Sequence, residues 1–181
     1  MEDKSNVICE SLDPSTGLFI SMALLRDVKN SKELKEKVMS GALKCAMMKP
    51  ALIVEPFQVI VAANKAAVSY LKNSMVTKSL YTELLFNLSI SKNITQSLVK
   101  FGIQEDDRNV LIATIHKENE PVIQDILSEI SGRLVPLVEL QEVCDMKLLC
   151  KSYKLNDAEK DNFVLLDAIV SRIATSDFVS Y

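Results

Sequence analysis

Short runs of hydrophobic residues near the N-terminus and in the second half of the chain predict β-strands. Val7–Leu12 and Leu18–Leu25 are two such runs, and the five residues between them include one proline and one glycine. Proline and glycine in so short a gap predict a hairpin between two strands. Asn109–His116, which is apolar and β-branched, predicts a further strand. Leu134–Val138 predicts an edge strand, because Pro136 has no N–H to donate to a neighbouring strand.

Elsewhere the hydrophobic residues recur at helical spacing. Pro56 is suited to the first position of a helix, and one apolar stripe follows it through Phe57, Ile60, Val61, Val68 and Leu71. The other predicted helices are Lys32–Ser40, Ser79–Leu88, a segment from Asn93 to Phe101, Pro121–Ser131, Leu140–Lys151 and Asp157–Thr175. Gly102 predicts a left-handed C-terminal turn after the third of these.

Strands and helices do not alternate in this order, which predicts an α+β fold: a small, mostly antiparallel sheet of about four strands packed by several helices. We expect a single domain over residues 1–181, with about six disordered residues at the N-terminus.

The composition supports a folded protein: 48% of the 181 residues are hydrophobic and 25% are charged. No apolar run approaches the roughly 20 residues that cross a bilayer, and the polar N-terminus lacks a signal-peptide core. We therefore expect an intracellular protein that is not bound to a membrane. The four cysteines form no C-x-x-C pair and have no histidine at zinc-ligand spacing, so we expect buried, reduced thiols.

Few residues in the sequence suggest catalysis. His116 is the one histidine, and it is either a lone general base or an ordinary residue at a strand end. Asp106 and Asp107 either contribute to a metal site or form a solvated turn. The four glycines lie too far apart for a phosphate-binding loop. We expect no enzyme activity, no cofactor and no metal.

Charge and two local features indicate binding instead. The segment Pro56–Ile103 has five lysines and one glutamate, a net charge of +4 in a chain of net charge −3. These lysines either form a phosphate-contacting surface or are dispersed for solubility. Asn64 lies within the apolar stripe of its helix, where it either caps a neighbouring backbone segment or faces a ligand. Phe86 falls outside the stripe of its own helix, and the C-terminal helix is apolar around much of its circumference, which allows one face to meet a partner.

Four blocks of sequence together resemble one protein family. They are Ile53–Ala66 (IVEPFQVIVAANKA), Thr82–Ser89 (TELLFNLS), Asn93-Ile94 leading to Lys100–Ile103, and Leu165–Ile169 with Arg172. In this order, over about Phe19–Asp177, they resemble the PRPK-binding (TPRKB) family, whose members are subunits of the KEOPS (EKC) complex.

The resemblance implies an α+β fold and a non-catalytic adaptor that binds the N-terminal lobe of a PRPK-type atypical kinase and supports its ATPase activity. Other KEOPS subunits would be reached through that kinase, in the cytoplasm and nucleus, and the complex would make N6-threonylcarbamoyladenosine at tRNA position 37. Archaeal relatives recruit tRNA by its 3′ CCA end. The residues expected to meet the kinase are Phe86, Leu166, Ile169 and Ile173, and those expected to contact tRNA are Asn64 and Lys65. The alternative is a free-standing RNA-binding protein that uses the lysine-rich segment 56–103.

Overall fold

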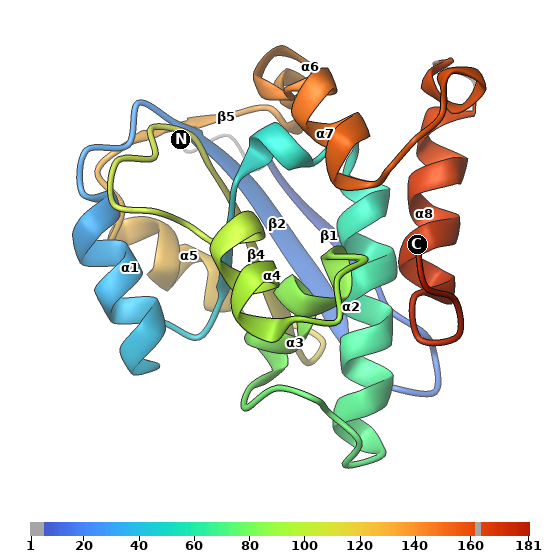
Figure 1. The fold of residues 1–181 in the computed structure, drawn as a ribbon. Coiled ribbons are helices and arrows are strands. Elements are labelled where there is room, and N and C mark those ends of the chain that lie inside the picture. Colours follow the sequence, from blue (N-terminus) through green and yellow to red (C-terminus); the bar gives the residue numbers. More distant parts are fainter. Residues whose placement is uncertain (1–5, 162–163) are drawn as a thin grey trace.

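The computed structural model describes residues 6–161 and 164–181 (Figure 1). Within them five strands form one antiparallel sheet: β1 (Val7–Ser11), β2 (Phe19–Arg26), β3 (Ala46–Met48), β4 (Val110–His116) and β5 (Arg133–Val135). β2 pairs with β4 along one edge, and along the other it pairs first with β1 and then with β5. β3 pairs with the far edge of β4. The predicted hairpin and the α+β class are confirmed, and the expectation for the first six residues falls mainly outside the described part.

The α-helices of the described residues are α1 (Ser31–Ser40), α2 (Pro56–Leu71), α3 (Leu80–Leu88), α4 (Ile94–Phe101), α5 (Val122–Ser128), α6 (Leu140–Val143), α7 (Met146–Ser152) and α8 (Leu165–Thr175). Three short 3₁₀ helices accompany them: η2 (Pro50–Leu52), η3 (Leu137–Glu139) and η4 (Asp157–Lys160). Local sequence explains several helix starts. The Ser79 hydroxyl accepts a hydrogen bond from the backbone N–H of Thr82 at the start of α3, and the Asn93 side chain accepts one from Gln96 at the start of α4.

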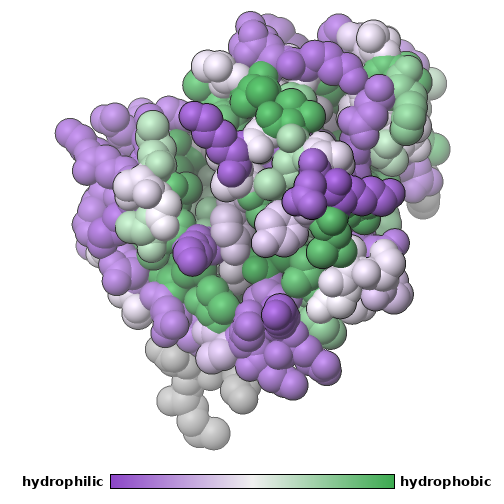
Figure 2. All heavy atoms as spheres, turned by 90° about the horizontal axis from the view of Figure 1, so that it is seen from below, coloured by the Kyte–Doolittle hydropathy of each residue, from purple (hydrophilic) through white to green (hydrophobic). Residues whose placement is uncertain are grey.

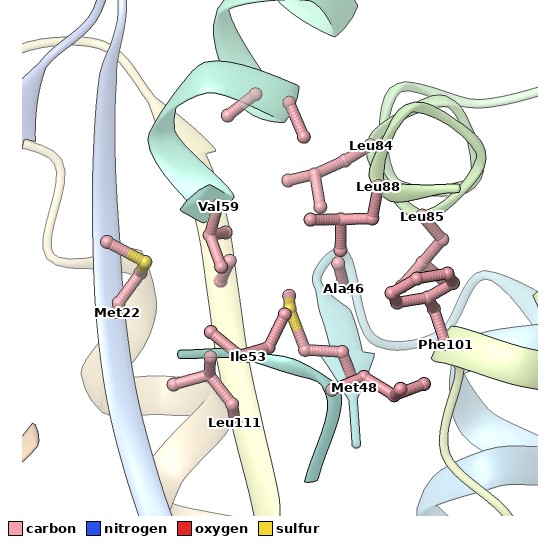
Figure 3. Packing of buried hydrophobic residues seen from close by; sticks show 14 of the residues in the cluster. Met22, Ala46, Met48, Ile53, Val59, Leu84, Leu85, Leu88, Phe101 and Leu111 are labelled. Atoms are coloured by element: carbon pink, nitrogen blue, oxygen red, sulfur yellow. The ribbon is translucent and has the colours of Figure 1, made fainter. Parts of the chain in front are cut away.

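The strands β2, β3 and β4 are buried on both faces, and alternating residues of β2 contribute to two separate hydrophobic clusters. Met22 and Leu24 belong to a large cluster with α2, α3, α7 and α8 (Figure 3). Ala23 and Leu25 belong to a smaller cluster with α1 and α5 on the opposite face. All seven residues of β4 are buried, which explains why this strand reads as a continuous apolar run.

The buried face of α2 differs from the predicted apolar stripe. Its buried residues are Gln58, Val59, Ala62, Ala63, Ala66 and Ala67. Phe57 and Leu71, which belong to the predicted stripe, are about half exposed. Small alanine side chains allow α2 to approach the sheet and α3 closely, so the larger apolar residues turn partly outward.

A buried hydrogen-bond network joins α2, α3 and the end of α7. The hydroxyl of Tyr153 donates to the backbone oxygen of Leu88 over 2.6 Å and accepts from Gln58 Nε2 over 2.9 Å. Gln58 Nε2 also donates to the oxygen of Leu52, and its Oε1 accepts from the N–H of Val54, each over 2.9 Å. Burial raises the pKa of Tyr153, so the phenol stays protonated and able to donate.

Two long predicted helices are each interrupted in the structure. Leu140–Lys151 divides into α6 and α7, because Cys144 is extended and the Asp145 side chain starts a new helix by accepting from the N–H of Leu148 over 3.0 Å. Asp157–Thr175 divides into η4 and α8, with residues 162–163 outside the described part.

Smaller differences concern strand and turn geometry. The predicted edge strand at 134–138 is shorter, and 3₁₀ turn η3 follows it. β3, with three residues, was not predicted. Gly102 has φ of −75°, so the left-handed turn expected there was wrong. Glycine is needed for space instead: a Cβ atom on Gly102 would lie 2.5 Å from the backbone oxygen of Leu98.

Candidate functional site at the junction of α2 and α8

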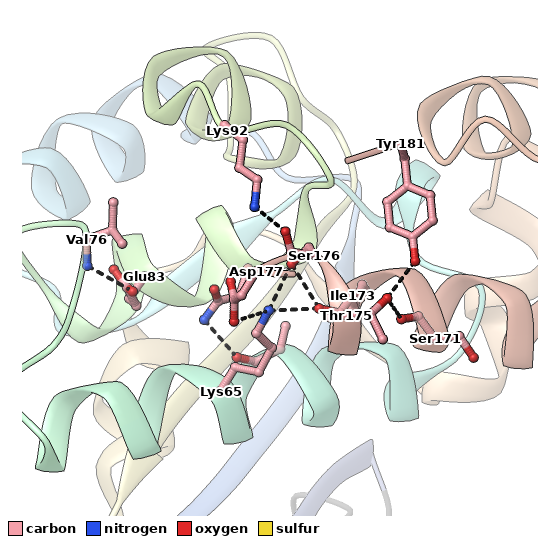
Figure 4. Close-up of polar contacts among 12 residues, drawn as sticks. Lys65, Val76, Glu83, Lys92, Ser171, Ile173, Thr175, Ser176, Asp177 and Tyr181 are labelled. Atoms are coloured by element: carbon pink, nitrogen blue, oxygen red, sulfur yellow. Dashed lines mark hydrogen bonds and ion pairs between the residues drawn. The ribbon is translucent and has the colours of Figure 1, made fainter. Parts of the chain in front are cut away.

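Lys65, predicted to contact tRNA, lies at the junction of α2 with the C-terminal end of α8 (Figure 4). Its ammonium group donates to the backbone oxygen of Ile173 over 2.8 Å and to Ser176 Oγ over 2.9 Å. It also forms an ion pair with Asp177 Oδ2 over 3.1 Å. The last carbonyl groups of a helix have no partners within the helix and carry partial negative charge, so a lysine is well placed to cap them. Lys65 therefore holds α8 against α2.

Lys92 binds the same helix end from a different segment. Its ammonium group donates to the backbone oxygen of Ser176, and the Ser176 hydroxyl donates to the oxygen of Ile173 over 3.0 Å. Two of the five lysines in the predicted basic segment are thus used to fix the end of α8. Lys65 and Lys92 both have a structural role, so their placement favours neither a phosphate-contacting surface nor dispersal for solubility.

Asn64 caps a neighbouring backbone segment, the first of its two predicted roles. Its Oδ1 accepts a hydrogen bond of 2.7 Å from the backbone N–H of Asp13, in the turn between β1 and β2. The same turn contains Gly17 at φ of +62°, a conformation that glycine adopts without strain. Asn64 thereby holds the predicted hairpin against α2.

The four residues expected to meet a kinase have unequal access to solvent. Phe86 on α3 and Leu166 on α8 are partly exposed. Ile169 and Ile173 are 0% exposed and belong to the large core cluster, so the structure offers neither side chain to a partner. The period of α8 places both isoleucines on the side that packs against α2.

Further apolar residues are exposed that the sequence analysis did not name as partner contacts. On α2 these are Phe57, Tyr70 and Leu71, and near α8 they are Val164, Phe178 and Val179. On the face seen in Figure 2, hydrophobic residues gather in patches between hydrophilic ones. For Phe57 and Leu71 the signal in the sequence was the apolar stripe of α2, which the sequence analysis did not interpret as a surface.

His116 is held in a buried polar contact. Its Nδ1 lies 2.7 Å from the backbone oxygen of Lys117, which can only accept, so Nδ1 carries a proton. Its Nε2 forms a hydrogen bond of 2.8 Å with the hydroxyl of Ser21. His116 and Ser21 are 7% and 5% exposed, which leaves a substrate little access to this pair. The arrangement fits the interpretation of His116 as an ordinary strand-end residue.

The other candidate groups also have structural partners. Asp107 Oδ2 accepts from the backbone N–H of Gln104 over 2.7 Å, as expected for a turn. Across the described residues, no three His, Cys, Asp or Glu side chains gather as a metal site requires.

The cysteines are free thiols, but only Cys45 is buried, and the expectation of a buried thiol was wrong for Cys9, which lies exposed on edge strand β1. None of the helices in the described ranges has the length and apolarity to cross a membrane.

Comparisons with known proteins agree on one family. The family described as "Kinase binding protein CGI-121" matches residues 25–177. A zebrafish (Danio rerio) protein named "EKC/KEOPS complex subunit TPRKB" is 36% identical over 159 residues, covering 87% of this chain and 91% of that protein. Fungal proteins named as the CGI121 subunit of the EKC/KEOPS complex are each 27% identical: one from Coccidioides immitis covers 83% of this chain and 76% of its own length, and one from Aspergillus fumigatus covers 88% and 93%. The chain therefore belongs to the CGI-121 family of kinase-binding proteins.

Proposed function

We propose that this protein is a non-catalytic adaptor subunit of a KEOPS complex, in which it binds a PRPK-type atypical kinase and supports its ATPase activity. The observation that carries the proposal is the match to the kinase-binding family over residues 25–177, together with relatives named as KEOPS subunits. The other KEOPS subunits are reached through the kinase. In this role the protein is required for the N6-threonylcarbamoyladenosine modification of tRNA position 37, and we propose that it acts in the cytoplasm and nucleus.

The surroundings of its polar groups support a non-catalytic role for this chain. His116 and Ser21, the pair closest to a base and a nucleophile, are nearly buried and bonded to each other. A base that must receive a substrate proton needs hydrogen-bond access to that substrate. The arrangement therefore supports a binding role over a catalytic one.

We propose Leu166 and Phe86 as the residues that meet the kinase. Both are partly exposed apolar side chains, and their helices α8 and α3 both pack against α2. Apolar side chains that lose their remaining exposure in an interface contribute roughly 25 cal/mol per Å² buried. A charge at either position would have to be desolvated on binding, which opposes association.

The test is size-exclusion chromatography of the chain with the PRPK-type kinase of its own organism, followed by an ATPase assay with and without the chain. We expect a co-eluting complex and a changed ATPase rate. Leu166→Glu and Phe86→Glu should each weaken the complex by about tenfold or more. Met39→Glu is the matched control, because Met39 is an exposed apolar residue on α1, across the sheet from α8. Separate elution of the unmodified chain and kinase at micromolar concentration would reject the adaptor role.

A direct contact with tRNA is proposed only for the assembled complex, through Asn64 and Lys65. Both side chains already have partners in this chain, so a tRNA contact would use their remaining exposed atoms. Lys72→Glu and Lys78→Glu test the alternative of a free-standing RNA-binding protein, because both lysines are exposed in the basic segment 56–103. The alternative requires tight, salt-dependent RNA binding by the isolated chain that these reversals abolish.

A further inference from the structure

Four segments that are far apart in the chain enclose a hollow of about 360 Å³. They are the loop between α3 and α4, the last turn of α4, the end of α7 and the residues after α8. The residues that line the hollow within the described part include four lysines and no aspartate or glutamate: Lys92, Lys100, Lys151 and Lys154. Lys92 and Lys154 donate to oxygens of the segment after α8, whereas the like charges of Lys100 and Lys151 repel each other.

The four lysines differ in their partners. Lys92 donates to the backbone oxygen of Ser176, and Lys154 donates to that of Tyr181, so the segment after α8 occupies one side of the hollow. Figure 4 shows Lys92 and Tyr181 on either side of the end of α8. Among residues 6–161 and 164–181, the ammonium groups of Lys100 and Lys151 have neither a hydrogen-bond acceptor nor an ion pair.

The surroundings of Lys100 make its protonated form less favourable than it is in water. Partial burial, and secondly the charge of Lys151, lower the pKa of Lys100. Both causes disfavour the protonated form. An anion between Lys100 and Lys151 would reverse the second of them.

The hollow also contains hydroxyl groups. Ser89, Ser91 and Ser180 line it together with Ser152. Ser152 is 7% exposed, and within the described residues its hydroxyl has no hydrogen-bond partner. Leaving a buried hydroxyl without a partner costs free energy. Rotation about the χ1 torsion changes the direction in which the Ser152 hydroxyl points. Lysine ammonium groups with serine hydroxyls are donors that suit phosphate oxygens.

We infer that this hollow is a binding site for a phosphate monoester or a diphosphate group, with Lys100 and Lys151 as its main charged contacts. A terminal phosphate carries up to about two negative charges on one group, which suits several lysines around a small hollow. A phosphodiester carries one charge per link and is bound along an extended surface instead. Neither Leu166 nor Phe86 lines the hollow, so the inference goes beyond the proposed kinase contact and does not depend on it.

The test is isothermal titration calorimetry of the full chain, without the kinase, with inorganic pyrophosphate and then with ADP. We expect binding that Lys100→Gln combined with Lys151→Gln weakens by about tenfold or more. The control combines Lys72→Gln with Lys78→Gln, which removes the same charge from two exposed lysines of the α2–α3 loop. The control should change the affinity by less than about twofold. Ser152→Ala, which keeps the charge, should weaken binding by a smaller factor.

Several outcomes decide the inference. Equal affinity for pyrophosphate and ADP would identify the diphosphate group as the determinant, whereas tighter binding of ADP would show that the nucleoside is held as well. No binding of either ligand, or equal losses in the Lys100/Lys151 and Lys72/Lys78 variants, would overturn the site. Short RNA without a terminal phosphate should not compete with pyrophosphate, and full competition would overturn the preference for a terminal phosphate. Circular dichroism melting of each variant identifies a loss of binding that follows from unfolding, and Ser152→Ala then decides in place of a variant that unfolds.

Discussion

Replacing Tyr153 with phenylalanine tests whether the buried network of α2, α3 and α7 stabilises the fold. The substitution removes one oxygen atom and keeps the ring, which packs edge-on against Phe101 with ring centroids 6.1 Å apart. The backbone oxygen of Leu88 loses the donor that lies 2.6 Å away. Because Leu88 is the last residue of α3, its carbonyl has no partner within the helix. Gln58 Nε2 keeps Leu52 as its second acceptor.

The expected loss of stability therefore comes mainly from one buried carbonyl without a partner. Such a group costs about 1–3 kcal/mol. With a urea m-value of about 2 kcal/mol/M, the midpoint of urea unfolding should fall by roughly 0.5–1.5 M. The assay is equilibrium unfolding in urea, followed by circular dichroism.

Tyr70→Phe provides the matched control, because Tyr70 is half exposed near the end of α2. It should change the free energy of unfolding by less than about 0.5 kcal/mol. A double-mutant cycle sharpens the test: in a Gln58→Leu background, Tyr153→Phe should have a changed effect, with a coupling energy of about 0.5–3 kcal/mol. Equal midpoints for Tyr153→Phe and Tyr70→Phe would refute the argument that this hydroxyl stabilises the fold.

Three further predictions concern other contacts. Lys65→Met removes the donor at the end of α8 and should lower the free energy of unfolding by about 1–2 kcal/mol in the same urea assay; an unchanged midpoint would contradict the argument that Lys65 holds α8 against α2. Hydrogen bonds from Arg172 lower the pKa of Glu159, so this carboxylate stabilises the fold above its unfolded pKa, and the effect is lost as the pH falls through its folded pKa. Glu159→Gln should therefore be less stable than the unmodified chain at pH 7, and thermal melts at pH values below about 4 should show the difference shrinking. Burial raises the pKa of Cys45 to about 12, so a thiol reagent at pH 8 should modify exposed Cys9 in the folded chain and Cys45 only after unfolding; rapid labelling of Cys45 would contradict its burial.

Local sequence was sufficient for those elements whose determinants lie within a few residues. The turn residues between Val7–Leu12 and Leu18–Leu25 defined the β1–β2 hairpin, and the run Asn109–His116 defined β4. Pro56 marked the start of α2. The four sequence blocks identified the family, which the comparisons confirm.

Only the tertiary structure decided which side of each helix is buried. A helical period identifies a stripe, but the neighbours determine whether that stripe faces a core or solvent. In α2 the alanine face packs inward, because small side chains permit close approach, and Phe57 and Leu71 remain half exposed. In α8 the same period placed Ile169 and Ile173 in the core and left Leu166 partly exposed.

The polar sites depend on the tertiary structure for a different reason. Lys65 and Lys92 meet at Ser176, and Lys100 and Lys151 border one hollow, although long stretches of sequence separate the members of each set. Sequence spacing governs contacts between residues within a turn or two of a helix, whereas these contacts form only when α4, α7 and α8 pack around α2 and α3. The sequence by itself determined the type of most elements, the family and the basic character of segment 56–103. Folding of the whole chain determined which lysines cap a helix end and which line the hollow, because such neighbours are set by proximity in space.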